Sequence, residues 1–172
     1  MPYTISDVNR MSQAIFVEVF GSVFEHTPAI ATHAWAKRPF ADSHDLHQTM
    51  TDIVGQLSYE DKRALICAHP DLGSRATMAE ASVNEQAGAG LNRLNPQDYD
   101  RLQMLNNAYH ARFGFPFIVA VKHHTLSSIF ETLEHRLNHS VETEMQQALL
   151  EISHIAWFRL SNLIHQADNR AE

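Results

Sequence analysis

The sequence predicts an all-α fold, a single-domain multi-helix bundle over residues 1–172 with a buried extended segment near 115–121. Apolar residues recur with helical period along most of the chain. They make up 44% of its 172 residues, which is enough for a sizeable core in one domain. Residues 115–121 break the period because they form a continuous apolar run that contains Pro116.

The periodic segments predict the positions of the helices. The expected ranges are 9–24, 29–37, 43–57, 58–68, a helix that begins at Ser82, 95–112, 126–137 and 141–166. Residues 70–81 read as a loop. Boundaries of the expected helices are marked by Pro28, Pro39 and Gly114.

Two boundaries carry a clear local signal. Asn95 is expected to be an N-cap, because Pro96 then takes the first helical position and Asp98 lies in the first turn. Ser43 is expected to cap the helix that follows it. At the other end of the 58–68 helix, Pro70 disfavours the α conformation for His69, so the helix should stop there.

The first candidate functional stretch is His69-Pro70-Asp71-Leu72-Gly73. A histidine at a helix C-terminus, held by a rigid proline, is well placed to act as an acid or a base. The alternative is a capping histidine that bonds only the last carbonyls of the helix. Spacing alone leaves both interpretations open.

The second candidate stretch is Ser82-Val83-Asn84-Glu85-Gln86, followed by small residues. It supplies a carboxylate and a carboxamide close in sequence to His69. Ser82 and Glu85 also match a capping box, in which Glu85 only satisfies a backbone N–H. From these residues alone the capping interpretation is favoured.

In the last helix, Arg159 falls where the apolar stripe calls for a core residue. An inward guanidinium needs an anionic partner, because burying it unpaired is costly. Arginine also binds carboxylates through two parallel hydrogen bonds. The alternative is that Arg159 lies at the edge of the stripe and extends to water.

Composition argues against several classes of function. The net charge of −7 and the lack of a basic block speak against a nucleic-acid or anionic-membrane partner. No apolar run is long enough to span a bilayer, and the first residues do not resemble a signal peptide. The single Cys67 fits a reducing cytosol, and is expected to be a buried core residue. A cytoplasmic location follows as an expectation.

The twelve histidines do not predict a metal site. His135 and His139 are four residues apart with Glu131 one turn earlier, but no His-Glu-x-x-His pattern occurs. These histidines fall at an expected helix end and should be solvated. We therefore expect no metal.

Taken together, the motifs resemble one family, the 2-oxo-4-hydroxy-4-carboxy-5-ureidoimidazoline (OHCU) decarboxylases, which act between urate and allantoin. The resemblance spans nearly the whole chain. It departs at Ala29, where the family often has tryptophan, and at His123, where a glycine is common. The matching motifs are His69–Gly73, Ser82-x-x-Glu85-Gln86-x-x-Ala89-Gly90-Leu91, Phe113–Ile118, Arg159-Leu160, Phe24–Pro28 and Arg38–Phe40.

The resemblance implies a cofactor-free, homodimeric carboxy-lyase that makes (S)-allantoin and CO₂ from OHCU. It implies that His69 is the catalytic imidazole and that Glu85 assists it. It also implies substrate contacts through Pro70, Ser82, Gln86, Phe117, Ile118 and Arg159. Alternatives are a non-catalytic helical module that binds a small anion, and a decarboxylase of a related ureido heterocycle.

Overall fold

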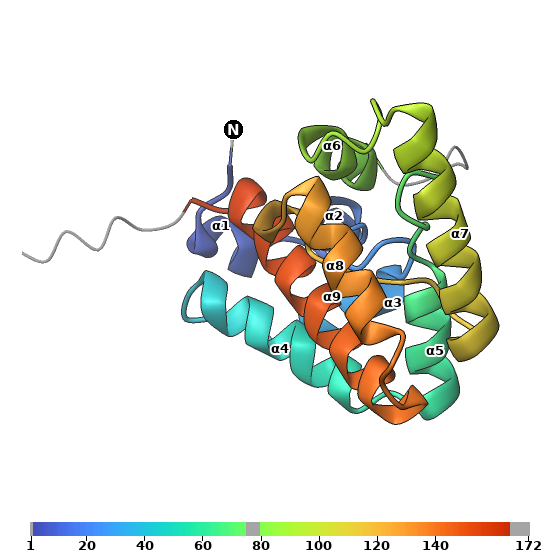
Figure 1. Cartoon of the computed structure of the whole chain (residues 1–172). Helices are drawn as coiled ribbons and strands as arrows, with labels where there is room; N and C mark the ends of the chain where they lie inside the picture. The colour runs from blue at the N-terminus through green and yellow to red at the C-terminus, as the bar shows by residue number, and fades with distance from the viewer. Residues whose placement is uncertain (1, 75–79, 166–172) are drawn as a thin grey trace, which may run out of the picture. The chain divides into compact units, whose positions relative to one another are not determined.

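The computed structural model describes residues 2–74 and 80–165, with side chains for all of them except residues 80–82. Its backbone contacts divide the chain into two compact units. One unit joins the N-terminal chain up to Ser58 with the chain from Ile155 onward, and the other is Tyr59–His154. Both units are built from helices (Figure 1), which confirms the all-α class. The single domain over 1–172 stays a prediction.

The first unit contains α1 (Ile5–Arg10), α2 (Gln13–Phe20), α3 (Pro28–Trp35) and α4 (Ser43–Gly55). It also holds the last part of α9 (Val141–Leu163). Helix α3 packs against both α2 and α4. The core of this unit is rich in aromatic and aliphatic side chains, including Phe16, Phe20, Phe24, Phe40, Leu46 and Met50.

Two expected boundaries in this unit are wrong. The helix expected over 9–24 is broken, because Met11 is extended and Ser12 starts α2 by accepting a hydrogen bond from the Ile15 N–H. Asp42, and not Ser43, caps α4, since its carboxylate accepts from the Asp45 N–H at 2.8 Å. In both places a local side-chain cap overrides the apolar period.

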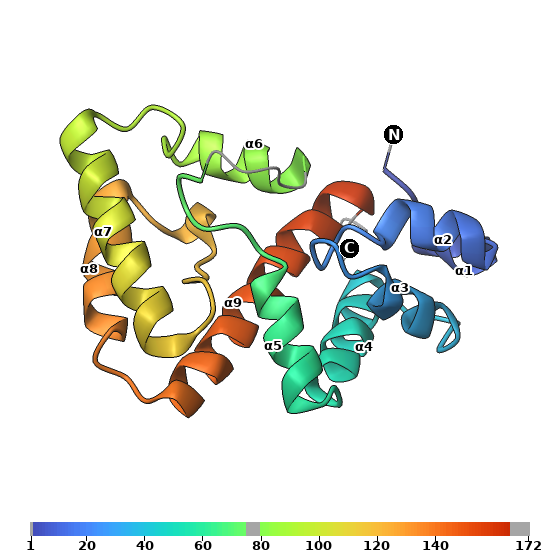
Figure 2. The ribbon, with the colours of Figure 1, turned by 90° about the vertical axis from the view of Figure 1, so that its right-hand side faces the viewer.

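The second unit contains α5 (Tyr59–Cys67), α6 (Glu80–Gly88), α7 (Pro96–Phe113), η1 (Val121–His123) and α8 (Leu126–Arg136). The first part of α9 completes it. Helix α7 lies beside α8 (Figure 2), and α6 packs on the short η1 turn. Both candidate stretches, 69–73 and 82–86, therefore belong to this unit.

The predicted cap of α7 is confirmed, because the Asn95 side chain accepts from the Asp98 N–H at 2.8 Å. Gly114 ends this helix with a left-handed φ of 74°, a conformation that glycine adopts without steric cost. Helix α6 instead begins at Glu80, so Ser82 lies inside the helix and the expected N-cap at Ser82 is wrong. Because α6 begins earlier than expected, Glu85 and Gln86 lie in its second turn rather than in its first.

The buried extended segment is confirmed. Every residue from Phe115 to Val121 is buried, and the residues between the end of α7 and Val121 are not helical. Its aromatic residues continue a cluster on α7, with the Tyr109 and Phe117 ring centroids 5.4 Å apart. Such a segment needs side-chain or main-chain partners for its peptide groups, since it has neither a helix nor a sheet to supply them.

Among the described residues, no helix combines the length and apolar character that crossing a bilayer requires. Cys67 is exposed at the end of α5, so its expected place in the core is wrong. The reason is helical geometry: the buried residues of α5 are Leu65 and Ile66, and position 67 turns away from them.

Candidate active site

His69 follows α5 directly and is buried, with 6% of its surface exposed. Its ring Nδ1 lies 2.9 Å from the carbonyl oxygen of Leu65. A carbonyl oxygen only accepts, so Nδ1 carries the proton of this hydrogen bond. In the neutral ring the basic lone pair is then on Nε2. The capping contact and the acid–base interpretation are thus compatible, because they use different nitrogens.

Helix α7 holds the loop that follows His69. The Asn106 amide donates to the Leu72 carbonyl at 3.0 Å, and His110 Nε2 lies 2.8 Å from the Asp71 carboxylate. Sequence reasoning missed both anchors. A signal existed for Asn106, since it is a polar residue directly after buried Leu105 on the apolar side of α7.

The side chain of Gln86 connects α6 to this same loop. Its Oε1 accepts a hydrogen bond from the Gly73 N–H at 2.9 Å, and Gln86 is buried. Gly73 has φ of 68°, and a Cβ added there would lie 2.9 Å from Leu102 Cδ2. The turn thus depends on glycine. This bond brings the two candidate stretches together, although they are separated in sequence.

Glu85 lines a pocket of about 300 Å³ between α6 and η1. Asn84 and Gly88 of α6 line the same pocket, and Lys122 and His124 line it from the other side. Sequence reasoning did not single out these last two residues. The side chain of Ser82, a predicted substrate contact, lies outside the described residues.

Side chains of α8 and α9 are partners for two peptide groups of the extended segment. The Ile118 carbonyl accepts from Arg136 Nη1 at 2.7 Å, and the Ala120 N–H donates to Glu151 at 2.8 Å. The Arg136 guanidinium also lies over the Phe117 ring, 4.6 Å from its centroid. Side chains of α8 and α9 therefore set the position of the predicted Phe117 and Ile118 contacts.

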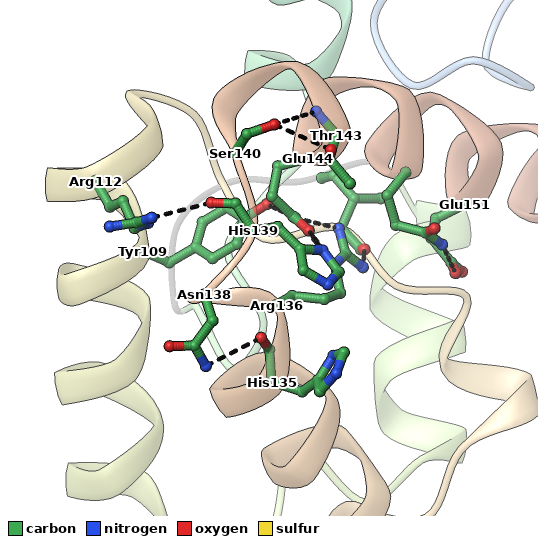
Figure 3. A network of polar contacts seen from close by, with 12 residues as sticks. Tyr109, Arg112, His135, Arg136, Asn138, His139, Ser140, Thr143, Glu144 and Glu151 are labelled. Atoms are coloured by element: carbon green, nitrogen blue, oxygen red, sulfur yellow. Dashed lines mark hydrogen bonds and ion pairs between the residues drawn. The ribbon is translucent and has the colours of Figure 1, made fainter.

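Arg136 belongs to a buried network that the sequence did not reveal (Figure 3). Its guanidinium pairs with Glu144 at 2.8 Å, and Glu144 is fully buried. Glu144 also accepts from the Tyr109 hydroxyl and lies 2.8 Å from His139 Nδ1. Burial raises the pKa of Glu144, but its hydrogen bonds to Arg136, Tyr109 and His139 outweigh this, so its pKa lies below the usual value.

The same burial acts on the phenol. Burial first, and then the hydrogen bond to Glu144, raise the pKa of Tyr109 far above its usual value. Tyr109 therefore stays protonated and serves as a donor at any physiological pH. The network is a charged pair completed by further hydrogen-bond donors, which is the arrangement that a buried carboxylate requires.

Arg159 is buried in the first unit, with 5% of its side chain exposed. Its Nη1 lies 3.0 Å from the carboxylate of Glu25 and also donates to the carbonyls of Ser22 and Val23. The expectation that an inward guanidinium has an anionic partner is confirmed, and the alternative of a side chain extending to water is wrong. Glu25 has φ of 49°, which is uncommon for a residue with a Cβ.

His135 and His139, the two histidines that were weighed as metal ligands, differ in exposure. The rings of His135 and His139 are 5.1 Å apart. His135 is exposed, as expected at a helix end, but the same expectation is wrong for His139, which is half-buried beside Glu144. In the described part of the chain, no three histidine, cysteine, aspartate or glutamate side chains gather closely enough to hold a metal ion.

The second unit thus joins four of the predicted residues. Gln86 reaches the loop that carries His69 and Pro70, and Glu85 is its neighbour on α6. Phe117 and Ile118 lie in the same unit, on the segment that leads to η1. Arg159 belongs to the other unit, so its place in a common site stays a prediction. An imidazole and a carboxylate on an all-α scaffold are the groups of a general acid–base enzyme.

Comparison with known proteins identifies the family. Residues 9–161 match the OHCU decarboxylase family. The chain is 40% identical over 169 residues to a 2-oxo-4-hydroxy-4-carboxy-5-ureidoimidazoline decarboxylase of Halalkalicoccus jeotgali, covering 98% of this chain and 96% of that one. The chain therefore belongs to the OHCU decarboxylase family.

Two longer proteins are also similar. The uric acid degradation bifunctional protein PucL of Bacillus subtilis is 46% identical over 162 residues, which cover 94% of this chain but 33% of PucL. A crystal structure of (S)-allantoin synthase superposes with a TM-score of 0.76 at 29% identity, over 96% of this chain and 55% of that chain. This chain thus spans about a third of PucL and about half of the synthase.

Proposed function

We propose that this chain is an OHCU decarboxylase that converts OHCU to (S)-allantoin and CO₂ in the degradation of urate. Membership of the family supports the reaction. The observation that carries the site is the hydrogen bond from the Gly73 N–H to Gln86, because it brings the histidine loop to the helix of Glu85.

The substrate can lose CO₂ without a coenzyme. The carbon that carries its carboxylate also carries a hydroxyl and is bonded to a C=N carbon. When the bond to the carboxylate breaks, its electron pair forms a C=C bond and the C=N pair moves to nitrogen, which takes up a proton. The enol that results then loses its hydroxyl proton and gains a proton on the former imine carbon. Addition from one face gives the S product.

His69 is the proton carrier in this scheme. Because Nδ1 is bonded to the Leu65 carbonyl, the proton moves on and off Nε2. The neutral ring removes the hydroxyl proton, and the charged ring returns a proton in the enol step. Histidine is the side chain that most often serves as a general acid and base, which suits both directions.

The carboxylate and amides of α6 orient the substrate. Glu85 faces the pocket and assists His69 or bonds the heterocycle. Gln86 uses its oxygen on the Gly73 N–H, so its amide N–H groups are the atoms suited to a ring carbonyl or ureido oxygen. Ser82 adds a hydroxyl contact from the same helix.

The remaining contacts come from outside α6. Pro70 and the main chain of Phe117 and Ile118 form part of the wall of the substrate site. Arg136 holds the Ile118 peptide in place. Arg159 donates a hydrogen bond to a substrate oxygen. Its charge is balanced by Glu25, so its part is to orient the substrate and to add little net charge.

The test replaces His69 with asparagine, whose amide N–H can keep the hydrogen bond to the Leu65 carbonyl while the basic Nε2 is lost. Freshly generated OHCU is supplied, and the appearance of optically active allantoin is followed by circular dichroism. We expect the rate of (S)-allantoin formation to fall by at least about a hundredfold, the size of a lost general acid–base group. His33→Ala, in α3 and exposed, is the control. A wild-type rate in His69→Asn would disprove the role of His69.

We also propose that the protein acts as a homodimer in the cytoplasm. The single, exposed Cys67 is compatible with a reducing compartment. Light scattering on the purified protein measures the assembly, and a mass of one chain, 19.5 kDa, would exclude the dimer. Fractionation of the source cells tests the location.

A further inference from the structure

Two successive peptide bonds of the extended segment are held by side chains of α8 and α9 (Figure 3). Arg136 Nη1 donates to the Ile118 carbonyl at 2.7 Å. The Glu151 carboxyl group accepts from the Ala120 N–H at 2.8 Å. Both peptide bonds are trans, so each has its C=O and its N–H on opposite sides. The N–H of Val119 therefore points away from Arg136, and its C=O points away from Glu151.

Val119 presents a buried donor and a buried acceptor. Neither its N–H nor its C=O forms a hydrogen bond within the described part of the chain, and Val119 is 3% exposed. Such groups are costly to bury without a partner. A donor beside an acceptor is complementary to the edge of an amide or a urea, in which an N–H lies next to a C=O. OHCU and allantoin both have this edge, in the ring and in the ureido group.

The same segment reaches the proposed site. Val121, two residues after Val119, lines the pocket of Glu85 between α6 and η1. The direction in which the Val119 peptide groups point therefore matters for a heterocycle bound there. That direction is set by the partners of the neighbouring peptides, because Val119 has no helix or sheet around it to fix it.

The Glu151 carboxyl group is itself held in place on α9. Gln147, one turn earlier, donates through Nε2 to its second oxygen at 3.0 Å. His154 Nδ1 lies 4.0 Å away, beyond hydrogen-bond distance. We propose that Glu151 is a positioning residue of this reaction, which fixes the Ala120 peptide so that the Val119 N–H and C=O meet an amide edge of the substrate. We rest this role on the proposed function, because the site is the same.

The chemistry predicts how the loss of Glu151 divides between binding and turnover. The amide edge lies outside the bonds that break and form, so its contact stabilises substrate, transition state and product alike. Removing Glu151 should therefore raise KM, leave kcat nearly unchanged and weaken allantoin by a similar factor. A variant that only unfolds in part would instead lower kcat and leave KM unchanged, since fewer molecules are active.

The experiment compares Glu151→Leu and Glu151→Gln with the wild-type chain. OHCU made in situ serves for the kinetics, and (S)-allantoin serves for calorimetry. Glu151→Leu should raise the KM of OHCU and the Kd of allantoin by about tenfold each, the size of one or two lost hydrogen bonds. Glu151→Gln keeps an oxygen that accepts from the Ala120 N–H, so both constants should change by less than about threefold.

Two further variants make the result specific. Glu142→Leu changes the net charge by the same amount at an exposed residue of the same helix, and should leave both constants unchanged. Gln147→Leu loosens the Glu151 carboxyl group without removing it, and should raise both constants by about threefold. This milder variant decides the question if Glu151→Leu does not fold.

The role of Glu151 is overturned if folded Glu151→Leu keeps the wild-type KM and Kd, or lowers kcat alone. It is also overturned if Glu151→Gln is as impaired as Glu151→Leu. Where Glu151→Leu does not fold, wild-type constants in Gln147→Leu overturn it. A wild-type chain that does not decarboxylate OHCU would instead overturn the proposed function, and the allantoin measurements would still decide whether Glu151 shapes the binding site.

Discussion

Replacing Arg136 with methionine should cost far more stability than replacing an arginine on the surface. Arg136 is 3% exposed, and its guanidinium makes contacts of 3.0 and 3.1 Å through Nε to the fully buried Glu144 carboxylate. Methionine keeps much of the apolar stem but leaves this carboxylate without its cation. Breaking a buried pair from one side costs about 3–5 kcal/mol. The loss of the donor to the Ile118 carbonyl acts in the same direction.

Arg101 is the matched control. It forms a 2.6 Å ion pair with Glu134, but both side chains are about half exposed. Such a pair contributes at most about 1 kcal/mol, so Arg101→Met should be mild. Urea unfolding followed by far-ultraviolet circular dichroism measures both variants. If Arg136→Met and Arg101→Met lower the unfolding free energy equally, the assignment of the network as a stabilising charged pair is refuted.

The same network predicts a pH dependence. The pKa of Glu144 is lower in the folded protein than in the unfolded chain, so its stabilisation is complete above the unfolded pKa. That stabilisation is lost as the pH falls through the lower, folded pKa. Wild-type stability should therefore decline in acid below about pH 4.3, the ordinary glutamate value. Glu144→Gln should be less stable at neutral pH and should show a flatter decline in acid.

Two more substitutions test the loop and the second buried pair. Gly73→Ala should lose about 1–2 kcal/mol in a thermal melt, since φ is 68° and the new Cβ would meet Leu102 Cδ2 at 2.9 Å. Gly55→Ala, with open space around it, should lose nothing. Arg159→Met should cost about 3 kcal/mol, and adding Glu25→Gln should recover part of it because no buried charge is then stranded. Strictly additive losses would contradict this coupling.

Local signals in the sequence were reliable where one residue decides the backbone. Asn95 and Gly114 were correctly placed at the ends of α7, because a side-chain cap and a left-handed glycine act over a single turn. The burial of residues 115–121 also followed from their composition. The family motifs added the candidate residues, including His69 and Glu85, before any geometry was known.

Competing local signals caused the errors. The apolar period over 9–24 continues across Ser12, and only the cap at this residue divides it. Ser82 and Glu85 match a capping box, yet α6 begins at Glu80 and takes both into its interior. Cys67 is exposed because its position on α5 turns away from Leu65 and Ile66, the buried residues of this helix.

From sequence alone came the helical class, the ends of its clearest helices and the residue types of an acid–base site, because each of these depends on neighbours within a few positions. Tertiary structure alone decided which groups meet. Gln86 bonds Gly73, Arg136 holds Ile118, and Lys122 faces the pocket of Glu85. These pairs join distant parts of the chain, and their geometry follows from how whole helices pack.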